Sequence, residues 1–334
     1  MIEVQNLTKQ YGPVTAIRDV SFAVAPGEIV GFLGPNGAGK STTMRILSCF
    51  MPATGGSARV AGFDVFRESM EVRRRIGYLP ENVPLYTDLR VAPYLDFVAE
   101  VKGVPRSARK KRVAEVMDRC LITEMQHRLI RNLSKGYRQR VGLAQAIVSD
   151  PHVLILDEPT IGLDPRQIAE IRALIKSLAG EHTVILSTHI LPEVSMVCDS
   201  VVIINRGSIV AQGPIARLVE EFFPTARVEV EIVGPGPAVL EGVRAIPGVV
   251  RVEAMAGPES NGSGRFVVES ARGRDVRGEI FQLAAQQRWM LLELRPVGMT
   301  LEEVFMKIVA GEEHQGTAAE PSPVDEMTQV APEP

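Results

Sequence analysis

The sequence predicts an α/β fold with a mixed sheet core, followed by a small α+β domain. Short apolar runs alternate with amphipathic stretches over about the first 220 residues, as in a parallel sheet with crossover helices. The strand patterns stop between about 91 and 150 and give way to helical spacing. After Pro224 apolar and polar residues alternate strictly, which indicates half-buried strands in a second domain.

Two kinds of strand are predicted in the first 220 residues. Three runs consist almost entirely of Val, Ile, Leu and Phe, the composition of strands that helices cover on both faces. Less apolar segments near the N-terminus predict a half-exposed antiparallel β subdomain. The buried runs are 29–33, 153–156 and 184–186, and the antiparallel segments are 2–7, 20–24 and 58–65.

The remaining elements follow from periodicity and turn residues. Helical spacing at about 91–150 predicts a helical insertion in the sheet. Beyond Pro224 the patterns give a β-α-β-β-α-β order, which is typical of ferredoxin-like folds. Thr300 and Glu303 predict a capping box at the start of a final helix. The expected strands of this domain are 227–233, 249–255, 265–269 and 290–294, its helices are 238–246 and 276–286, and its turn is 260–264.

These elements divide the chain into three predicted parts. Residues 1–220 form the first domain, and residues 225–311 form an accessory domain. From Glu312 to the end the chain has six acidic residues, four prolines and no Lys or Arg. This composition predicts a disordered acidic tail over 312–334.

Composition excludes several classes of protein. The net charge of −3 is too small for an indiscriminate nucleic-acid binder. No stretch free of charged residues exceeds 13 residues, whereas a membrane-spanning helix needs about 20 apolar ones. The N-terminus does not resemble a secretory signal, and three widely spaced cysteines favour buried thiols in a reducing cytoplasm. The basic run 106–112 lacks aromatic residues, so we expect a solvated helix face there.

A glycine-rich loop follows the predicted strand 29–33. Residues 34–41 match the pattern G-x-x-x-x-G-K-[ST] at every fixed position, between a strand and a helix. In such loops backbone N–H groups wrap the phosphates, Lys40 bridges the β- and γ-phosphates, and Ser41 binds Mg²⁺. The sequence therefore predicts a site for ATP and Mg²⁺. The expected nucleotide-binding residues are Gly34, Pro35, Asn36, Gly37, Ala38, Gly39, Lys40, Ser41 and Thr42.

Two carboxylates end the predicted strand 153–156. Asp157 is placed to hold Mg²⁺ through water, and Glu158 to orient and deprotonate the attacking water. Acidic residues before a proline also start many helices, which is the alternative interpretation of this pair. The phosphate loop in the same chain favours the interpretation in which these carboxylates bind Mg²⁺ and activate water.

Polar residues also end the strand 184–186, in the order Ser187, Thr188 and His189. Open α/β sheets bind ligands beyond the carboxyl ends of their strands. A lone histidine is more often structural, but this edge already carries the phosphate loop and the carboxylates. We therefore expect His189 to sense the γ-phosphate.

Taken in order, these motifs resemble the ATP-binding subunit of an ATP-binding cassette (ABC) transporter. Residues 133–137, Leu-Ser-Lys-Gly-Tyr, resemble the family signature Leu-Ser-Gly-Gly-Gln, and residues 162–165 resemble the loop after the second motif. Tyr11 matches the aromatic residue that stacks on adenine. Residues 300–305 are similar to the ending found in the drug-resistance, sodium-efflux and gliding-motility exporter subgroup. The cassette resemblance covers roughly 1–220 and implies the P-loop NTPase fold.

The resemblance implies a homodimer that sandwiches two ATP molecules and drives a separate multi-span membrane permease, and the subgroup named above implies an exporter. Ser134, Gly136 and Asp164 would then contact nucleotide held by the second copy. Glu81 stands where the family usually has Gln, and it would ligate Mg²⁺. Permease contact is expected near 81–94, so the protein would lie on the inner face of the cell membrane. No nucleic acid is expected as a partner.

Two other functions remain open from the sequence. The chain could be a cassette ATPase that acts on DNA, ribosomes or protein machines, although it has neither a second cassette nor a long coiled coil. Residues 225–311 could also serve as a regulatory or dimerisation module.

Overall fold

The computed structural model describes residues 1–222, 225–255, 263–271, 274–298 and 300–316. The chain divides into two compact units, Met1–Glu221 and Phe222–Pro334. Helix α11 (Leu301–Gly316) includes residues 312–316, which the composition assigns to the tail. The rest of the predicted disordered tail lies outside the described residues.

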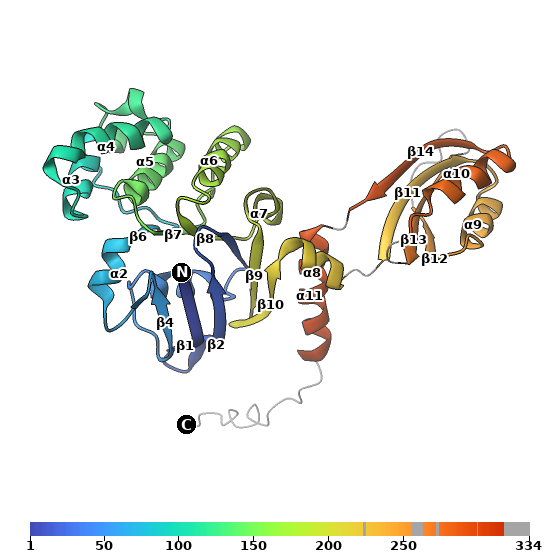
Figure 1. The fold of residues 1–334 in the computed structure, drawn as a ribbon, viewed down its shortest axis with the longest axis horizontal. Helices are drawn as coiled ribbons and strands as arrows, with labels where there is room; N and C mark the ends of the chain where they lie inside the picture. The colour runs from blue at the N-terminus through green and yellow to red at the C-terminus, as the bar shows by residue number, and fades with distance from the viewer. Residues whose placement is uncertain (223–224, 256–262, 272–273, 299, 317–334) are drawn as a thin grey trace, which may run out of the picture. The chain divides into compact units, whose positions relative to one another are not determined.

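The core of the first unit is a six-stranded sheet in the order β10-β9-β3-β8-β7-β6 (Figure 1). The three predicted buried strands are confirmed at its centre, where every residue of β3, β7 and β8 is buried. All neighbouring strands are parallel except the edge strand β10. The strands are β3 (Ile29–Leu33), β6 (Ile76–Leu79), β7 (Val153–Asp157), β8 (Thr183–Thr188), β9 (Ser200–Asn205) and β10 (Ser208–Pro214).

A second, antiparallel sheet with the order β2-β1-β4-β5 confirms the N-terminal β subdomain. The prediction of one strand over 58–65 was wrong, because the chain reverses between Val60 and Phe63, which are paired. Ala61 and Gly62 both have positive φ, 52° and 85°, as two-residue hairpin turns require. The strands are β1 (Ile2–Tyr11), β2 (Val14–Val24), β4 (Gly55–Val60) and β5 (Phe63–Asp64).

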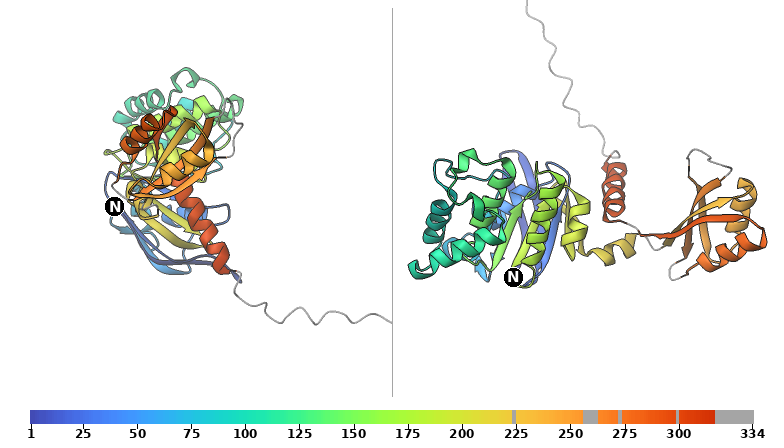
Figure 2. Two further views of the ribbon diagram at one scale, coloured as in Figure 1. Left: turned by 90° about the vertical axis from the view of Figure 1, so that its right-hand side faces the viewer. Right: turned by 90° about the horizontal axis from the view of Figure 1, so that it is seen from above.

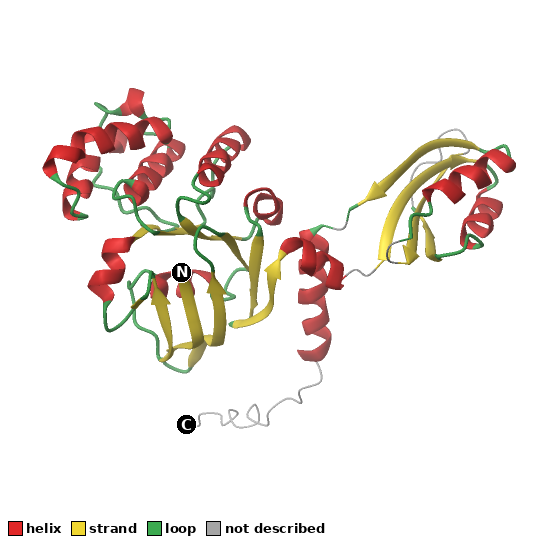
Figure 3. Ribbon diagram, viewed as in Figure 1, coloured by secondary structure: helices red, strands yellow, loops and turns green. Residues whose placement is uncertain are grey.

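Helix α1 (Lys40–Leu47) shares one apolar core with both sheets of this unit. Met44 of this helix is fully buried there, together with Phe22 and Phe32, whose ring centroids are 5.4 Å apart. Figure 3 shows helices on the other face of the six-stranded sheet, among them α6 (Pro165–Ser177) and α7 (Leu191–Val197). Because α1 packs between the six-stranded sheet and the antiparallel sheet, packing on both sides fixes its position.

The helical insertion is confirmed as α3 (Val91–Val101), α4 (Arg106–Arg119) and α5 (Lys135–Ile147), and two 3₁₀ turns precede α5. Figure 2 shows these helices gathered at one end of the first unit. Helix α2 (Ser69–Arg75) precedes β6, which leads into the insertion. Helix α8 (Ile215–Phe222) follows the edge strand β10.

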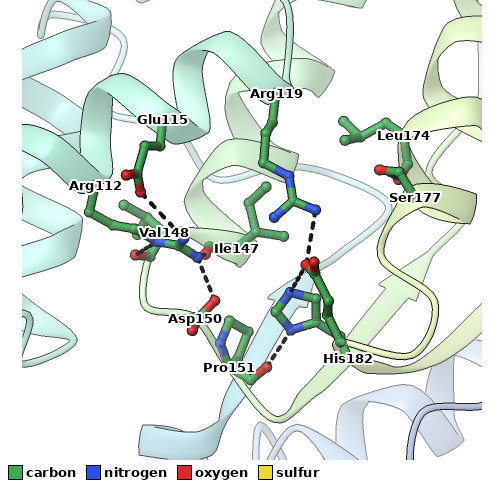
Figure 4. Close-up of polar contacts among 11 residues, drawn as sticks. Arg112, Glu115, Arg119, Ile147, Val148, Asp150, Pro151, Leu174, Ser177 and His182 are labelled. Atoms are coloured by element: carbon green, nitrogen blue, oxygen red, sulfur yellow. Dashed lines mark hydrogen bonds and ion pairs between the residues drawn. The ribbon is translucent and has the colours of Figure 1, made fainter.

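The prediction of a solvated face for residues 106–112 was wrong for two of the arginines. The side chains of Arg109 and Arg112 are only 13% and 20% exposed. Arg109 pairs with Glu100 at 2.6 Å, and Arg112 donates to the Ile147 carbonyl at 2.9 Å and to Asp150 at 2.8 Å. Figure 4 shows how Arg112 reaches the carbonyl end of α5, where unpaired backbone oxygens attract cations.

The second unit has the predicted β-α-β-β-α-β order, with its antiparallel sheet arranged β12-β13-β11-β14. Val228, Phe266 and Val268 belong to an apolar core on the helix side of this sheet. The expected turn at 260–264 lies mostly outside the described residues. The elements are β11 (Thr225–Val233), α9 (Gly236–Arg244), β12 (Val249–Ala254), β13 (Ser263–Ala271), α10 (Arg277–Gln286) and β14 (Met290–Val297).

The predicted capping box at the start of α11 is confirmed. The Glu303 N–H donates to Thr300 Oγ1 at 3.3 Å, and the Thr300 N–H donates to Glu303 Oε2 at 2.9 Å. These bonds satisfy two backbone donors that a helix start leaves without partners.

Both edge strands of this sheet contain an irregularity. In β12 the register shifts between Val249 and Arg251, so Val250 is left between paired residues. In β14 the register shifts between the pairs formed by Leu291 and Glu293, which leaves Leu292 in the same position. Both side chains are exposed.

The three cysteines are buried free thiols, as expected, and burial raises the pKa of Cys120 to about 12. Within the part of the chain that the structure describes, no helix is both long and apolar enough to cross a bilayer.

Candidate functional site

The glycine-rich loop connects β3 to α1. Gly37 and Gly39 have φ values of +80° and +107°, which glycine adopts more readily than other residues. At Gly34 a Cβ atom would lie 2.3 Å from the Ile204 carbonyl oxygen, so a side chain there would collide with the backbone of β9. The loop therefore needs glycine for two different reasons, conformation and space.

Lys40 is the first residue of α1, and its side chain is buried. Its ammonium donates to the carbonyl oxygens of Gly34 at 2.8 Å and Pro35 at 3.1 Å. Burial lowers the pKa of Lys40, while the nearby carboxylates of Glu158, Asp157 and Glu81 act to raise it. These three carboxylates therefore favour the charged ammonium that a phosphate ligand would need.

Asp157 ends β7, directly opposite Ser187 in the neighbouring strand β8. Its Oδ1 accepts hydrogen bonds from Ser187 Oγ and, at 3.2 Å, from Ser41 Oγ. A serine hydroxyl and a carboxylate oxygen thus lie side by side, and Mg²⁺ prefers such oxygen ligands, completed by phosphate and water. Among the described residues, no group of three His, Cys, Asp or Glu side chains could hold a metal without such help.

Glu158 and His189 face each other beyond the ends of the same two strands. His189 Nδ1 lies 3.0 Å from each carboxylate oxygen of Glu158. The Glu158 backbone has a φ of +50°, and its N–H donates to the Ser187 carbonyl at 3.0 Å and to Ser187 Oγ at 3.2 Å. Hydrogen bonds that Ser187 of β8 accepts therefore stabilise Glu158 in an unusual conformation, as is frequent at functional sites.

Several of these groups line one cavity of about 550 Å³, whereas Asp157 and the loop residues Gly34, Pro35 and Ala38 are not among its lining residues. The cavity brings together the phosphate loop, Glu158 and His189, as the sequence predicted for a shared strand edge. Glu81, to which the family resemblance pointed, lines it as well. Ala16 and Ile161 also line it, and no motif in the sequence pointed to them. The predicted residues that line the cavity are Asn36, Gly37, Gly39, Lys40, Ser41, Thr42, Glu81, Glu158 and His189.

Other candidate residues lie elsewhere in the first unit. Ser134 caps α5, and a Cβ atom on Gly136 would lie 2.5 Å from Oε1 of Gln167. Asp164 caps α6 by accepting from the Gln167 N–H at 2.9 Å. The starts of α5 and α6 thus adjoin each other, and Ser134, Gly136 and Asp164 are not among the residues that line the cavity.

Tyr11 also does not line the cavity. It ends β1, its side chain is exposed, and its hydroxyl lies 3.0 Å from the sulfur of Met51.

Sequence reasoning missed one buried contact beside the cavity. Thr160 Oγ1 donates to Glu193 Oε2 at 2.7 Å, and both residues are buried. The two residues are 33 positions apart and belong to no motif that we recognised, so only the fold shows that they meet.

Residues 17–161 match the family model described as "ABC transporter". The chain is 33% identical over 247 residues to the linearmycin resistance ATP-binding protein LnrL of Bacillus subtilis, covering 74% of this chain and 79% of that protein. It is 38% identical to the bacitracin transport ATP-binding protein BcrA of Bacillus licheniformis, covering 65% and 71%. A bacterial ABC transporter cassette solved as a dimer superposes with a TM-score of 0.60 at 25% identity, covering 64% and 98%.

Proposed function

The chain belongs to the ABC transporter family of ATP-binding proteins, and on this premise we propose that it hydrolyses ATP to drive a separate membrane permease. The contact between Glu158 and His189 above the phosphate loop carries this proposal. A carboxylate and an imidazole that share a cavity with the phosphate loop support a site in which water attacks the terminal phosphate.

The phosphate loop and Lys40 would hold the phosphates of ATP, and Tyr11 would stack on its adenine. Ser41 and Asp157 would hold Mg²⁺, which supplies charge neutralisation at the phosphates, and Glu81 would be a further oxygen ligand. The Ser41–Asp157 hydrogen bond of 3.2 Å supports this assignment, because it brings the two oxygens together.

Glu158 would accept a proton from the attacking water, and His189 would hold that carboxylate and contact the γ-phosphate. Exposure differs between the two side chains: Glu158 is buried, whereas His189 is partly open to solvent. The exposed imidazole can therefore reach toward a ligand while its Nδ1 stays on the carboxylate.

A second copy of the chain would complete the site. Ser134, Gly136 and Asp164 lie at the adjoining starts of α5 and α6, apart from the cavity that holds Lys40. In a face-to-face dimer these groups would contact nucleotide bound by the partner copy, and the solved dimeric relative supports that arrangement.

The permease would bind a cluster of aromatic residues in the predicted segment 81–94, which Phe97 extends by three residues. Tyr86 stacks against Tyr94 and Phe97 with ring centroids 5.8 and 5.6 Å apart, and Tyr86 and Phe97 are 57% and 42% exposed. Exposed apolar groups of this kind are common at protein interfaces. The resistance function named for LnrL supports an exporter, with this protein on the inner face of the membrane.

The Glu158→Gln substitution tests the proposal. We expect ATP turnover by the purified chain to fall about 100-fold or more, the usual contribution of a positioned general base. Binding of ATP should persist, because the phosphate loop is unchanged. The matched control is Glu229→Gln, which removes a charge from the second unit and should leave turnover unchanged. Undiminished turnover by Glu158→Gln would show that Glu158 is not the base.

A further inference from the structure

We propose that Thr160 and Glu193 form a positioning pair that fixes the distance between Glu158 and His189. The inference rests on the proposed ATP hydrolysis at this site. Neither residue lines the cavity, and neither is expected to touch ATP.

The pair joins two segments that leave adjacent strands. Thr160 lies two residues after Glu158 in the turn between β7 and α6, and Glu193 lies in the first turn of α7, which follows His189. Thr160 Oγ1 donates to Glu193 Oε2 at 2.7 Å. Thr160 is 3% exposed and Glu193 is 6% exposed, so water competes little for this hydrogen bond.

This contact is the third hydrogen bond between side chains in a series that joins the same two segments. The first joins Ser187 to Asp157, and the second joins His189 to Glu158 at 3.0 Å. The second contact is the one that faces the cavity, and it lies along the chain between the other two. Holding both neighbours fixed would leave the Glu158 carboxylate little freedom relative to the imidazole.

A buried carboxylate is costly unless hydrogen bonds compensate its lost hydration. For Glu193 the structure provides the Thr160 hydroxyl and a position near the positive end of α7. Removal of the hydroxyl would leave the carboxylate poorly compensated, so Glu193 and the start of α7 would shift toward solvent. His189 lies two residues before α7 and would move with it.

The phosphate loop adjoins this series at Asp157, the end away from Thr160 and Glu193, through the Ser41 hydrogen bond of 3.2 Å. It is fixed by α1 and by its contact with β9. Loss of the Thr160–Glu193 contact should therefore slow the chemical step and leave ATP binding unchanged, a combination that general unfolding would not produce.

The decisive variant is Thr160→Val, which replaces a hydroxyl by a methyl group of similar size. We expect kcat to fall about 10- to 100-fold, as small misplacements of reacting groups do, with the Kd for ATP within about twofold of the parent. Thr160→Ser keeps the hydroxyl and should restore most of the turnover.

Thr183→Val is the matched control. Thr183 is also a buried threonine with one hydrogen bond, from the Gly27 N–H at 2.9 Å, but it lies at the opposite end of β8. It should lose comparable stability in a denaturant titration and keep its kcat. Equal losses of kcat in Thr160→Val and Thr183→Val would reject a positioning role.

A parallel measurement of Glu158→Gln separates the two proposals. If Glu158→Gln is inactive and Thr160→Val keeps full kcat, the positioning pair is rejected while ATP hydrolysis at this site stands. If Glu158→Gln is fully active, the proposed function itself fails. Should Thr160→Val not fold, Glu193→Asp makes the same test, because it withdraws the carboxylate from Thr160 and retains the charge.

Discussion

The sheets of the two units place their polar residues differently. In the six-stranded sheet, the central strands are buried throughout and polar side chains gather at their carboxyl ends, where Asp157 and Ser187 bond to each other. In the sheet of the second unit, charged residues alternate with apolar ones and pair across the face that points away from the apolar core. The pairs there are Arg227 with Glu269, Arg265 with Glu231, and Arg295 with Glu229.

The difference shows what charge in a sheet can indicate. On the exposed face each arginine has a carboxylate opposite it, so the charges neutralise each other and need no ligand. At the strand ends of the first unit, Lys40 shares a cavity with Glu81 and Glu158, and the nearby Asp157 adds a third negative charge. Charges that converge on a cavity, rather than the number of charges, mark the candidate site.

Substitutions in the apolar cores should cause the largest losses in the free energy of unfolding. Each substitution should affect its own unit, so these losses should distinguish the two units. Phe32→Ala removes a fully buried ring from the first core, and Phe266→Ala removes one from the second. Each should cost about 3–5 kcal/mol in the free energy of unfolding of its own unit. Calorimetry should show one lowered transition for each variant, because the two cores are separate. A single shared transition lowered equally by both would show that the units unfold together.

Removal of a buried hydroxyl should cause a smaller loss in the free energy of unfolding. Ser187→Ala removes a donor to Asp157 and an acceptor for the Glu158 N–H, and should cost about 1–3 kcal/mol in a urea titration. Ser270→Ala is the counterpart in the second unit, where the hydroxyl donates to the Arg274 carbonyl at 2.8 Å. Both should lose stability, but only Ser187→Ala should slow ATP turnover. Slower turnover in Ser270→Ala would contradict the contrast between the sheets.

The smallest effect is expected on the charged face. Arg265→Met breaks the 2.9 Å pair with Glu231 but keeps an apolar stem. Exposed pairs contribute about 0.2–1 kcal/mol, and salt screens them. The change in the urea midpoint should therefore be slight at low salt and should vanish near 1 M NaCl. A large, salt-independent loss would show that this face is a specific interface rather than a solvated one.

The sequence predicted the parts of the fold that local patterns encode. Continuous apolar runs identified β3, β7 and β8, because a strand that is buried on both faces is apolar at every position. Strict alternation identified β11, because a strand that is buried on one face is apolar at every second position. Strands β6, β9 and β10 were missed. The order of strands in each sheet is also absent from local patterns, since neighbours such as β3 and β8 are far apart in the chain.

The candidate site divides in the same way. Lys40 and Ser41 belong to a loop of fixed spacing, so their proximity could be predicted. The Ser41–Asp157 and Thr160–Glu193 contacts join segments that only the folded sheet brings together. The arginines at 109 and 112 were misjudged because their acceptors, such as the carbonyl end of α5, come from other helices.

The register irregularities at Val250 and Leu292 have a consequence for self-association. A regular edge strand with exposed apolar side chains invites the strand of another molecule, and a chain of such additions grows into a fibre. In this sheet each edge strand has a register irregularity at its exposed apolar residue. The backbone N–H and C=O groups on either side of that residue could therefore not pair in one regular register with an added strand. We therefore expect the irregular edges to disfavour open-ended strand addition to this sheet.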